Sequence, residues 1–452
     1  MPDQSAAELP VVVIGAGPTG LTAAAHLRGR DVPVVVLESG PAAATAVSEW
    51  GHVRLFSPWS ELVDPVAAEL VRASGWTEPA PARYPTGAEW IDSYLQPLAD
   101  ALGDSVRYGT TVTSVTRQSR DRLVSSGRDA APFTVHVRTS GGAEHVAARA
   151  VIDASGTWNG PNPLGGDGVP AIGEIENVDR ISYRVPDFGD PAVRTRYAGK
   201  HVVVAGTGAS AKGALIGLAA LATEVPGTRV TWLVRRPSVG DAFAGSGQDE
   251  LPERGALGQQ ARAAVRTGPV TTMSGFRASA LSVSEDGALT VESFDGPSVE
   301  RVDEIIVLTG FRPDLTMLSE VRLDLDPVLQ APRALAPLID PNEHSCGTVY
   351  PHGATELAQP EIGFFLVGMK SYGRATSFLA LTGFEQTRSV AAAIAGDHEA
   401  AARVELTLPD TGVCGGAGTF DDEEPAAGGG CCGAPAAPHL ISLGGSSGSR
   451  RG

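Results

Sequence analysis

The sequence is poor in cysteine, in basic residues relative to acidic ones, and in long apolar runs. Four cysteines in 452 residues are too few for a disulfide framework in a chain of this size. The 35 lysines and arginines against 52 acidic residues give a formal charge of -17, which argues against a surface that binds nucleic acid. No segment approaches the roughly 18 consecutive apolar residues of a membrane span, and the first residues lack a signal-peptide pattern. We therefore expect a cytoplasmic protein that binds neither nucleic acid nor a membrane.

A glycine-rich turn lies between a strand-like run and a helix-like run near the start of the chain. In VVVIGAGPTGLTAAAHL, the β-branched residues predict a buried strand, and Gly15, Gly17 and Gly20 have the GxGxxG spacing of a dinucleotide-binding turn. These glycines permit a tight turn and a close approach to a pyrophosphate, which the N-terminus of a helix beginning at Pro18 stabilises. The next apolar run ends in Glu38, and a carboxylate there accepts hydrogen bonds from a ribose hydroxyl. We predict that this unit binds FAD.

A second glycine-rich turn, VVVAGTGASAKG, repeats the pattern in the middle of the chain. An alanine replaces its third glycine, which the motif tolerates, and the next strand, RVTWLVRRPS, ends in two arginines instead of an acid. A guanidinium group pairs well with the 2′-phosphate that distinguishes NADP from NAD, so we predict NADPH here; the alternative is that both arginines are solvated surface charges. The residues predicted to hold NADPH are Gly206, Gly208, Ala209, Ser210, Ala211, Arg235 and Arg236.

The order of these patterns predicts the fold class and the domains. Two β-α-β units with buried strands indicate an α/β protein with two Rossmann-like dinucleotide-binding domains, the NADPH domain being inserted into the FAD domain. The end of the chain is rich in glycine, alanine and cysteine without apolar periodicity, and we expect a flexible tail there. The predicted segments are 1–165 and 313–400 for the FAD domain, 166–312 for the NADPH domain and 401–452 for the tail.

Four motifs together resemble the two-dinucleotide flavoprotein superfamily: GAGPTG, GTGASAKG, ASGTW and LTGFRPD. The wide separation of the two glycine turns is more similar to flavin-containing monooxygenases than to thioredoxin reductases. The resemblance implies that the first turn binds FAD and the second NADPH, and that reduced flavin activates O2 for transfer to soft nucleophiles. It also implies cofactor contacts at Gly156, Gly310 and Gly368. The histidine motif typical of these monooxygenases is replaced here by ENVDRISYRVPDFGD.

Other segments are similar to a bacterial branch of these flavoproteins that is found with arsenic-resistance genes: HSCGTVYPHG, VGMKSYGRATSF, LPDTGVC and the terminal GCCG. The last two contain Cys414, Cys431 and Cys432. Thiolates are soft ligands, and three of them would suit trivalent arsenic or antimony as a bound metalloid. Two alternatives stay open, namely a redox disulfide between the adjacent pair and a tail whose cysteines have no role.

Three residues are candidates for the chemistry itself. Cys346 lies near His344 and His352, and a histidine neighbour can lower the pKa of a thiol; the alternative is a small buried side chain. Arg54 and Trp59 belong to RLFSPW, where related folds place side chains near the flavin and shield it from water; the alternative is a core position. Beside the final predicted strand, the candidates to contact flavin or substrate, or to be structural, are Lys370, Tyr372 and Arg374.

Three functions follow from these patterns. We expect an NADPH-dependent flavoprotein that uses O2 to oxidise a small soft substrate, a trivalent arsenical. The second hypothesis is a thiol, disulfide or metal reductase that uses the terminal cysteine pair, although the chain has no CxxC pair of the kind that route normally needs. The third is a non-enzymatic metalloid or redox sensor. The partner expected in all three is a small molecule, and a homodimer is left open.

Overall fold

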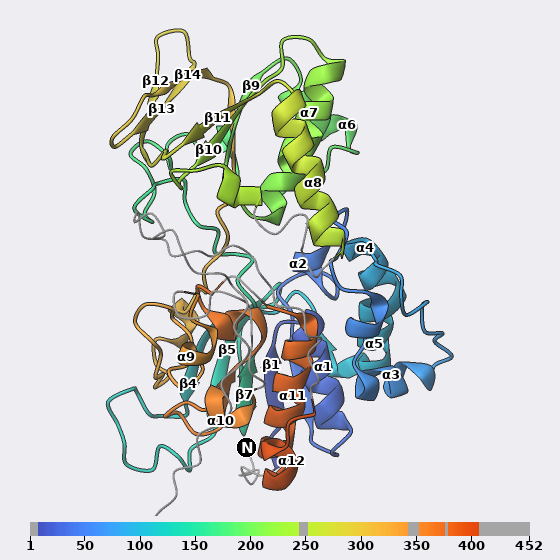
Figure 1. Ribbon diagram of the computed structural model, residues 1–452. Helices are drawn as coiled ribbons and strands as arrows, with labels where there is room; N and C mark the ends of the chain where they lie inside the picture. The colour runs from blue at the N-terminus through green and yellow to red at the C-terminus, as the bar shows by residue number, and fades with distance from the viewer. Residues whose placement is uncertain (1–7, 244–251, 342–351, 376–377, 406–452) are drawn as a thin grey trace, which may run out of the picture. The chain divides into compact units, whose positions relative to one another are not determined.

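The computed structural model describes residues 8–243, 252–341, 352–375 and 378–405 (Figure 1). All of these belong to one structural unit, Met1–Phe420, whereas the second unit, Asp421–Gly452, lies outside the described residues. The predicted tail is therefore described only as far as residue 405, and its flexibility stays a prediction.

The first sheet has five parallel strands in the order β16-β7-β1-β2-β3. Every residue of its central strand, β1, is buried, because valine and isoleucine suit a strand covered on both faces. The edge strand β16 comes from late in the chain and pairs with β7, so the sheet is completed after the second sheet in the sequence. The strands are β1 (Val11–Ile14), β2 (Val34–Leu37), β3 (Val106–Arg107), β7 (Ala150–Asp153) and β16 (Phe364–Leu366).

Helices accompany this sheet, and two of them matter for the site. Helix α1 (Pro18–Arg28) follows the first glycine turn and packs along α11 (Ala380–Ile394), close to β1 (Figure 1). Buried alanines on both helices allow this close approach. The other helices of this part are α2 (Thr45–Ser48), α3 (Pro65–Arg72), α4 (Gly87–Trp90), α5 (Gln96–Leu102), α9 (Ala336–Ile339), α10 (Ala354–Leu357) and α12 (His398–Ala402). Short 3-10 or π turns span Trp59–Glu61, Ile91–Leu95, Gly103–Ser105, Val178–Arg180, Gly240–Phe243, Thr316–Leu318 and Gly368–Tyr372.

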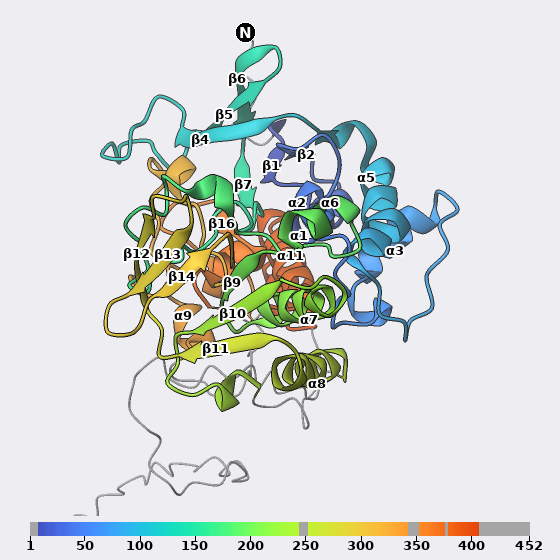
Figure 2. The same cartoon turned by 90° about the horizontal axis from the view of Figure 1, so that it is seen from above.

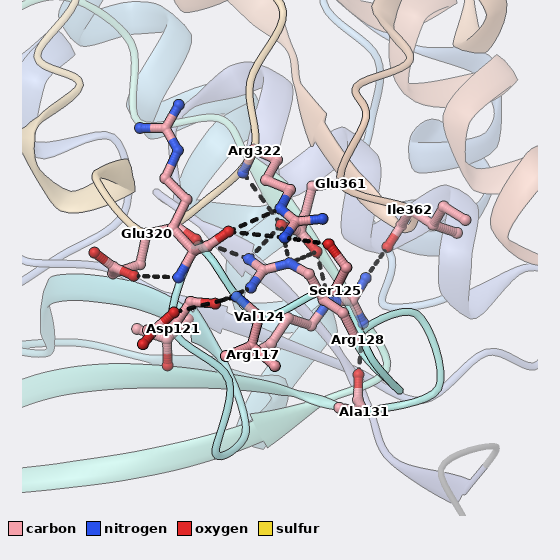
Figure 3. A network of polar contacts seen from close by, with 12 residues as sticks. Arg117, Asp121, Val124, Ser125, Arg128, Ala131, Glu320, Arg322, Glu361 and Ile362 are labelled. Carbon is pink, nitrogen blue, oxygen red and sulfur yellow. Dashed lines mark hydrogen bonds and ion pairs between the residues drawn. The ribbon is translucent and has the colours of Figure 1, made fainter.

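An antiparallel sheet stands between β3 and β7 in the sequence, formed by β4 (Thr111–Arg117), β5 (Phe133–Thr139) and β6 (Gly142–Ala148). A buried charge cluster around Glu361 fixes the segment between β4 and β5 (Figure 3). The Glu361 side chain is 1% exposed and accepts hydrogen bonds from Arg117 Nε at 2.8 Å and Arg128 Nη2 at 2.6 Å. Burial acts to raise the pKa of Glu361, but the hydrogen bonds from Arg128 and Arg117 outweigh it and lower that pKa.

The second sheet is also parallel, with the strand order β11-β10-β9-β15-β8. Helices α7 (Ala209–Glu224) and α8 (Pro252–Thr267) lie side by side next to β10 and β11 (Figure 2). The segment ALSVSEDGALTVESFDG forms an antiparallel pair of strands, to which a third strand is added. The remaining elements are α6 (Pro191–Tyr197), β8 (Ile181–Ser182), β9 (His201–Ala205), β10 (Arg229–Val234), β11 (Val270–Ser274), β12 (Ala278–Val283), β13 (Leu289–Ser293), β14 (Val299–Val302) and β15 (Glu304–Val307).

Two parallel sheets, each with a glycine turn between its central strand and a helix, confirm the predicted α/β class with two dinucleotide-binding folds. The strands of the second sheet lie in the sequence between β7 and β16 of the first, as an inserted domain requires. The individual domain boundaries stay predictions. No helix in the described portion of the chain is long and apolar enough to cross a membrane.

Candidate functional site

The first glycine turn packs closely against neighbouring backbone at Gly15 and Gly20 and faces open space at Gly17. Gly15 has φ +97, and a Cβ at Gly20 would lie 1.9 Å from the carbonyl oxygen of Gly15, so neither position tolerates a side chain. A Cβ at Gly17 would meet nothing within 4 Å. Helix α1 begins at Pro18, and no side chain caps its first turn. Uncapped N–H groups beside open space fit a pyrophosphate group.

Glu38 follows β2 directly and is 8% exposed. Its carboxylate accepts hydrogen bonds from the backbone N–H groups of Ala16 and Gly40, each at 2.8 Å. Glu38 Oε1 also accepts from Ser39 Oγ at 3.4 Å, whereas Oε2 accepts only from Ala16 among the described residues. Glu38 lines the cavity described below, so Oε2 retains a lone pair for a ribose hydroxyl. The predicted position of Glu38 is therefore compatible with its predicted role.

Two more glycines lie on the same cavity wall. Gly156 has φ +67, and a Cβ there would meet nothing within 4 Å. Gly368, also with φ +67, lies so close to α1 that a Cβ would be 2.9 Å from Thr19 Oγ1. Both therefore bring backbone against the space next to the first turn.

A buried ion pair closes the carboxyl edge of this sheet. Lys370 Nζ lies 2.7 Å from Asp153 Oδ2 and 3.0 Å from Ser155 Oγ, and the two charged side chains are 1% and 0% exposed. The sequence singles out Lys370 but neither of its partners, Asp153 and Ser155. The available signal was an acid that ends an apolar strand just before the ASGTW turn.

The second glycine turn is built in the same way but is less restrictive. Gly206 has φ +120, and a Cβ there would lie 2.2 Å from the carbonyl oxygen of Leu308. Gly208 has open space around it, while the methyl group of Ala211 is accommodated and fully buried. Helix α7 also begins without a side-chain cap, so its N-terminus can bind a phosphate group.

Arg235 and Arg236 follow β10 immediately, at the place where a coenzyme ribose is bound in such units. Arg235 is exposed and Arg236 is half-buried. Neither lines the cavity that joins the two glycine turns, which is described next.

A cavity of about 1230 Å³ joins the two turns. Its walls include Gly15, Gly17 and Pro18 at one end, and Ala209 and Ser210 of α7 at the other. The volume is larger than that of an ordinary small-molecule site, as two dinucleotide ends and a substrate require. The aromatic side chains on its walls are Trp50, Phe56, Trp90, Trp158, Phe188 and Phe378.

The predicted catalytic residues are dispersed. Arg54 lines the cavity, where its Nη1 donates to the carbonyl oxygen of Tyr84. Trp59 is 1% exposed, packs in the core and is not on the cavity wall, so the structure favours the core alternative for it. The loop reaches the cavity through Trp50 and Phe56 instead, which sequence reasoning missed because WGHVRLFSPW offers several aromatics without marking their direction.

The other predicted residues lie away from the cavity or outside the described part of the chain. Gly310, with φ +93, accepts a hydrogen bond from the backbone of Asn162 at 2.9 Å and does not line the cavity. His352 is buried, and its Nε2 lies 2.8 Å from Gln386 Nε2. The residues outside the described ranges are Cys346, Cys414, Cys431 and Cys432. Within those ranges, no three metal-ligating side chains gather.

A family model described as pyridine nucleotide-disulphide oxidoreductase matches residues 12–345. The chain belongs to this family. It is therefore an oxidoreductase that uses FAD and NADPH. This rejects the hypothesis of a non-enzymatic sensor. No curated protein matches the chain.

Solved structures share the fold of this pyridine nucleotide-disulphide oxidoreductase. The bacillithiol disulfide reductase Bdr from Bacillus cereus has 20% identity and a TM-score of 0.61, over 86% of this chain and 99% of that one. The cadaverine monooxygenase DfoA from Erwinia amylovora has 14% identity and a TM-score of 0.59, over 88% and 98%. The flavin-containing monooxygenase from Stenotrophomonas maltophilia has 22% identity and a TM-score of 0.53, over 86% and 98%. Reductases and monooxygenases thus share this architecture, and the site must distinguish them.

Proposed function

We propose that this oxidoreductase is a monooxygenase that uses NADPH and O2 to oxidise a small soft substrate, a trivalent arsenical. One oxygen atom is transferred to arsenic, which rises from the trivalent to the pentavalent state. The other oxygen atom leaves as water, with two electrons from NADPH and two protons. FAD, when bound, supplies the two-electron chemistry that connects NADPH to O2.

In this proposal the chain's own residues bind and orient the cofactors. The first turn and the N-terminus of α1 hold the FAD pyrophosphate, and Glu38 accepts from its ribose. The second turn and the N-terminus of α7 hold NADPH, and Arg235 and Arg236 bind its 2′-phosphate. The aromatic walls exclude water from the space between the two, which oxygen chemistry requires.

One observation carries the choice of an oxygenase over a reductase. Disulfide reductases of this kind normally use a cysteine pair spaced CxxC or CxxxxC beside the flavin, and the sequence, with cysteines only at positions 346, 414, 431 and 432, contains no such pair. The described cavity walls carry aromatic and aliphatic side chains. The soft-substrate assignment is supported by the three cysteines of the tail, since thiolates bind trivalent arsenic well.

The test is the stoichiometry of NADPH, O2 and product in the purified full-length protein. With arsenite or methylarsenite, we expect one pentavalent product for each NADPH and each O2 consumed, with little hydrogen peroxide. Production of one hydrogen peroxide for each NADPH, regardless of the arsenical, would overturn the proposal in favour of an oxidase. NADPH consumption without O2 uptake would overturn it in favour of a reductase.

The second candidate function is a disulfide reductase that uses Cys431 and Cys432. It is favoured by the family model and by the similarity in fold to a bacillithiol disulfide reductase. The double variant C431S–C432S separates the two candidates. An oxygenase would lose affinity for the arsenical but keep NADPH oxidation, whereas a reductase would lose turnover with disulfide substrates.

A further inference from the structure

A buried ammonium group stands at the cavity wall where the first sheet ends. The Lys370 side chain is 1% exposed, yet Lys370 and Ser155 both line the cavity, whereas Asp153 does not. Asp153 and Ser155 accept two of the three N–H groups of Lys370, and the described residues supply no third acceptor. The third N–H is therefore available to a ligand.

The partners of Lys370 hold it in one orientation. Ser155 donates to Asp153 Oδ1 through its hydroxyl at 2.6 Å and through its backbone N–H at 3.0 Å, while Lys370 occupies Asp153 Oδ2. Both carboxylate oxygens are thus engaged, and Asp153 itself does not line the cavity. A buried lysine without such a partner would be strongly destabilising, so the pair fixes a positive charge at a place where solvent does not screen it.

The charges around the cavity make this lysine unusual. Among the described wall residues, Lys370 and Arg54 are the only lysine and arginine, and Arg54 is exposed. The charge of Lys370 reaches its neighbours: the pKa of Asp314 is lowered by hydrogen bonds from Thr316 and, to a smaller extent, by Lys370. The acidic residues on the same walls are Glu38, Glu49, Glu253 and Asp314. A buried cation among these acids favours an anionic ligand.

Lys370 also lies next to the first glycine turn. Ser155, which accepts from it, is in contact with this turn, since a Cβ at Gly15 would lie 3.1 Å from Ser155 Cα. Gly368, two residues before Lys370, packs against Thr19 in the first turn of α1. The ammonium group and the uncapped N-terminus of α1 therefore adjoin the same part of the cavity.

We propose that Lys370 binds an anionic oxygen of FAD through its third N–H, with Asp153 and Ser155 as positioning residues. This inference rests on the proposed binding of FAD at the first turn. The anionic oxygen belongs either to the pyrophosphate or to the reduced ring system. A pyrophosphate contact strengthens the binding of oxidised and reduced FAD equally, whereas a contact with the reduced ring favours the reduced form and raises the reduction potential.

The experiment compares two variants in which a buried ion pair is neutralised. D153N–K370Q removes both charges of the cavity pair and leaves hydrogen-bonding groups in place. E385Q–R388Q does the same to a pair in α11 that is 2.7 Å apart, with 6% and 9% exposed side chains, and does not line the cavity. FAD affinity is measured by quenching of FAD fluorescence on titration with apoprotein, and the reduction potential by equilibration with a reference dye.

We expect D153N–K370Q to bind FAD about 10- to 100-fold more weakly, or to favour reduced FAD about tenfold less, which lowers the potential by about 30 mV. Weaker binding of FAD would identify the pyrophosphate as the group that Lys370 contacts, and a lower reduction potential would identify the reduced ring system. E385Q–R388Q is expected to keep the affinity and potential of the wild type. Unchanged affinity and potential in D153N–K370Q, or equal losses in both variants, would overturn the inference.

A second variant keeps the inference testable if D153N–K370Q does not fold. S155A retains the ion pair but removes one acceptor that orients the ammonium group, and we expect FAD affinity to fall about 3- to 10-fold. In S155A, an FAD affinity within twofold of the wild type together with an unchanged reduction potential would then decide against Lys370. Failure of the wild-type protein to bind FAD at all would refute the proposed function itself, and is seen in the same titration.

Discussion

The two glycine turns share one design and differ at two positions, and these differences support our proposal that the turns bind two kinds of ligand. The first turn has no room for a side chain at Gly20, whereas the second accommodates the methyl group of Ala211. The first β-α-β unit ends in Glu38, while the second ends in arginines. An acid at the end of the second strand suits a ribose that is free of phosphate, and arginines at that position suit a coenzyme with a 2′-phosphate.

The two folds also differ in how they stabilise charge. Glu361 in the first is 1% exposed and is bonded to two arginines that are nearly as buried. Glu304 in the second has 10% exposure, and its partners Arg196 and Lys200 are 37% and 38% exposed. A buried charge that loses its partner is costly, whereas a solvated ion pair contributes little. The first fold therefore depends on its central carboxylate far more than the second.

The largest effect is expected for E361Q. This variant leaves two buried guanidinium groups without a counter-charge, and we expect a loss of about 3–5 kcal/mol in the free energy of unfolding, measured by chemical denaturation of the apoprotein. The matched variant E304Q removes a carboxylate between half-exposed cations, and we expect a loss of about 1 kcal/mol or less. Equal losses in the two variants would contradict the comparison.

The same carboxylate predicts a pH dependence. The pKa of Glu361 in the folded protein is lowered, because hydrogen bonds from Arg128 and Arg117 outweigh the effect of burial. Its contribution to stability is therefore fully present above the ordinary glutamate pKa of about 4.3 and is lost as the pH falls through the lower folded-state value. The stability difference between the wild type and E361Q should be constant near neutral pH and shrink in acid. A difference that grows in acid would exclude this assignment.

A smaller effect is expected when a methyl group is added to the first turn, in G20A, or removed from the second turn, in A211G. In G20A, the new Cβ would lie 1.9 Å from the carbonyl oxygen of Gly15, so the backbone must shift. We expect a loss of about 1–3 kcal/mol in stability and loss of FAD on gel filtration. In A211G, no clash arises, and we expect about 1 kcal/mol or less with FAD retained. Retention of FAD by G20A at the level of A211G would show that the first turn is not specially restrictive.

Local patterns predicted the parts of the site that depend on neighbouring residues. The turn at Gly15 and the carboxylate of Glu38 follow from a strand, a turn and a second strand that are adjacent in the sequence. The Lys370–Asp153 pair could not be found in this way, because 217 positions separate its members and only β16, pairing with β7, brings them together. The same applies to Glu361, whose partners Arg117, at the end of β4, and Arg128, in the segment after β4, lie 244 and 233 positions away in the sequence. Trp59 shows a second limit, since the sequence of an aromatic loop does not reveal which rings face a cavity.

The smallest effect concerns the two arginines after β10. If they bind the 2′-phosphate, R235A and R236A should each raise the KM for NADPH about tenfold, with the KM for NADH unchanged, because a charge-assisted hydrogen bond contributes about 1.5–3 kcal/mol. The control is R229A, which removes an exposed arginine from the opposite end of the same strand and should change neither KM. Each cofactor is assayed by steady-state oxidation at fixed ionic strength, since screening would otherwise mimic the loss. If one arginine is a solvated charge, its variant will behave like R229A. If both variants behave like R229A, the second fold binds its coenzyme through the glycine turn alone. The difference between Glu38 and the two arginines would then not explain which dinucleotide each fold binds.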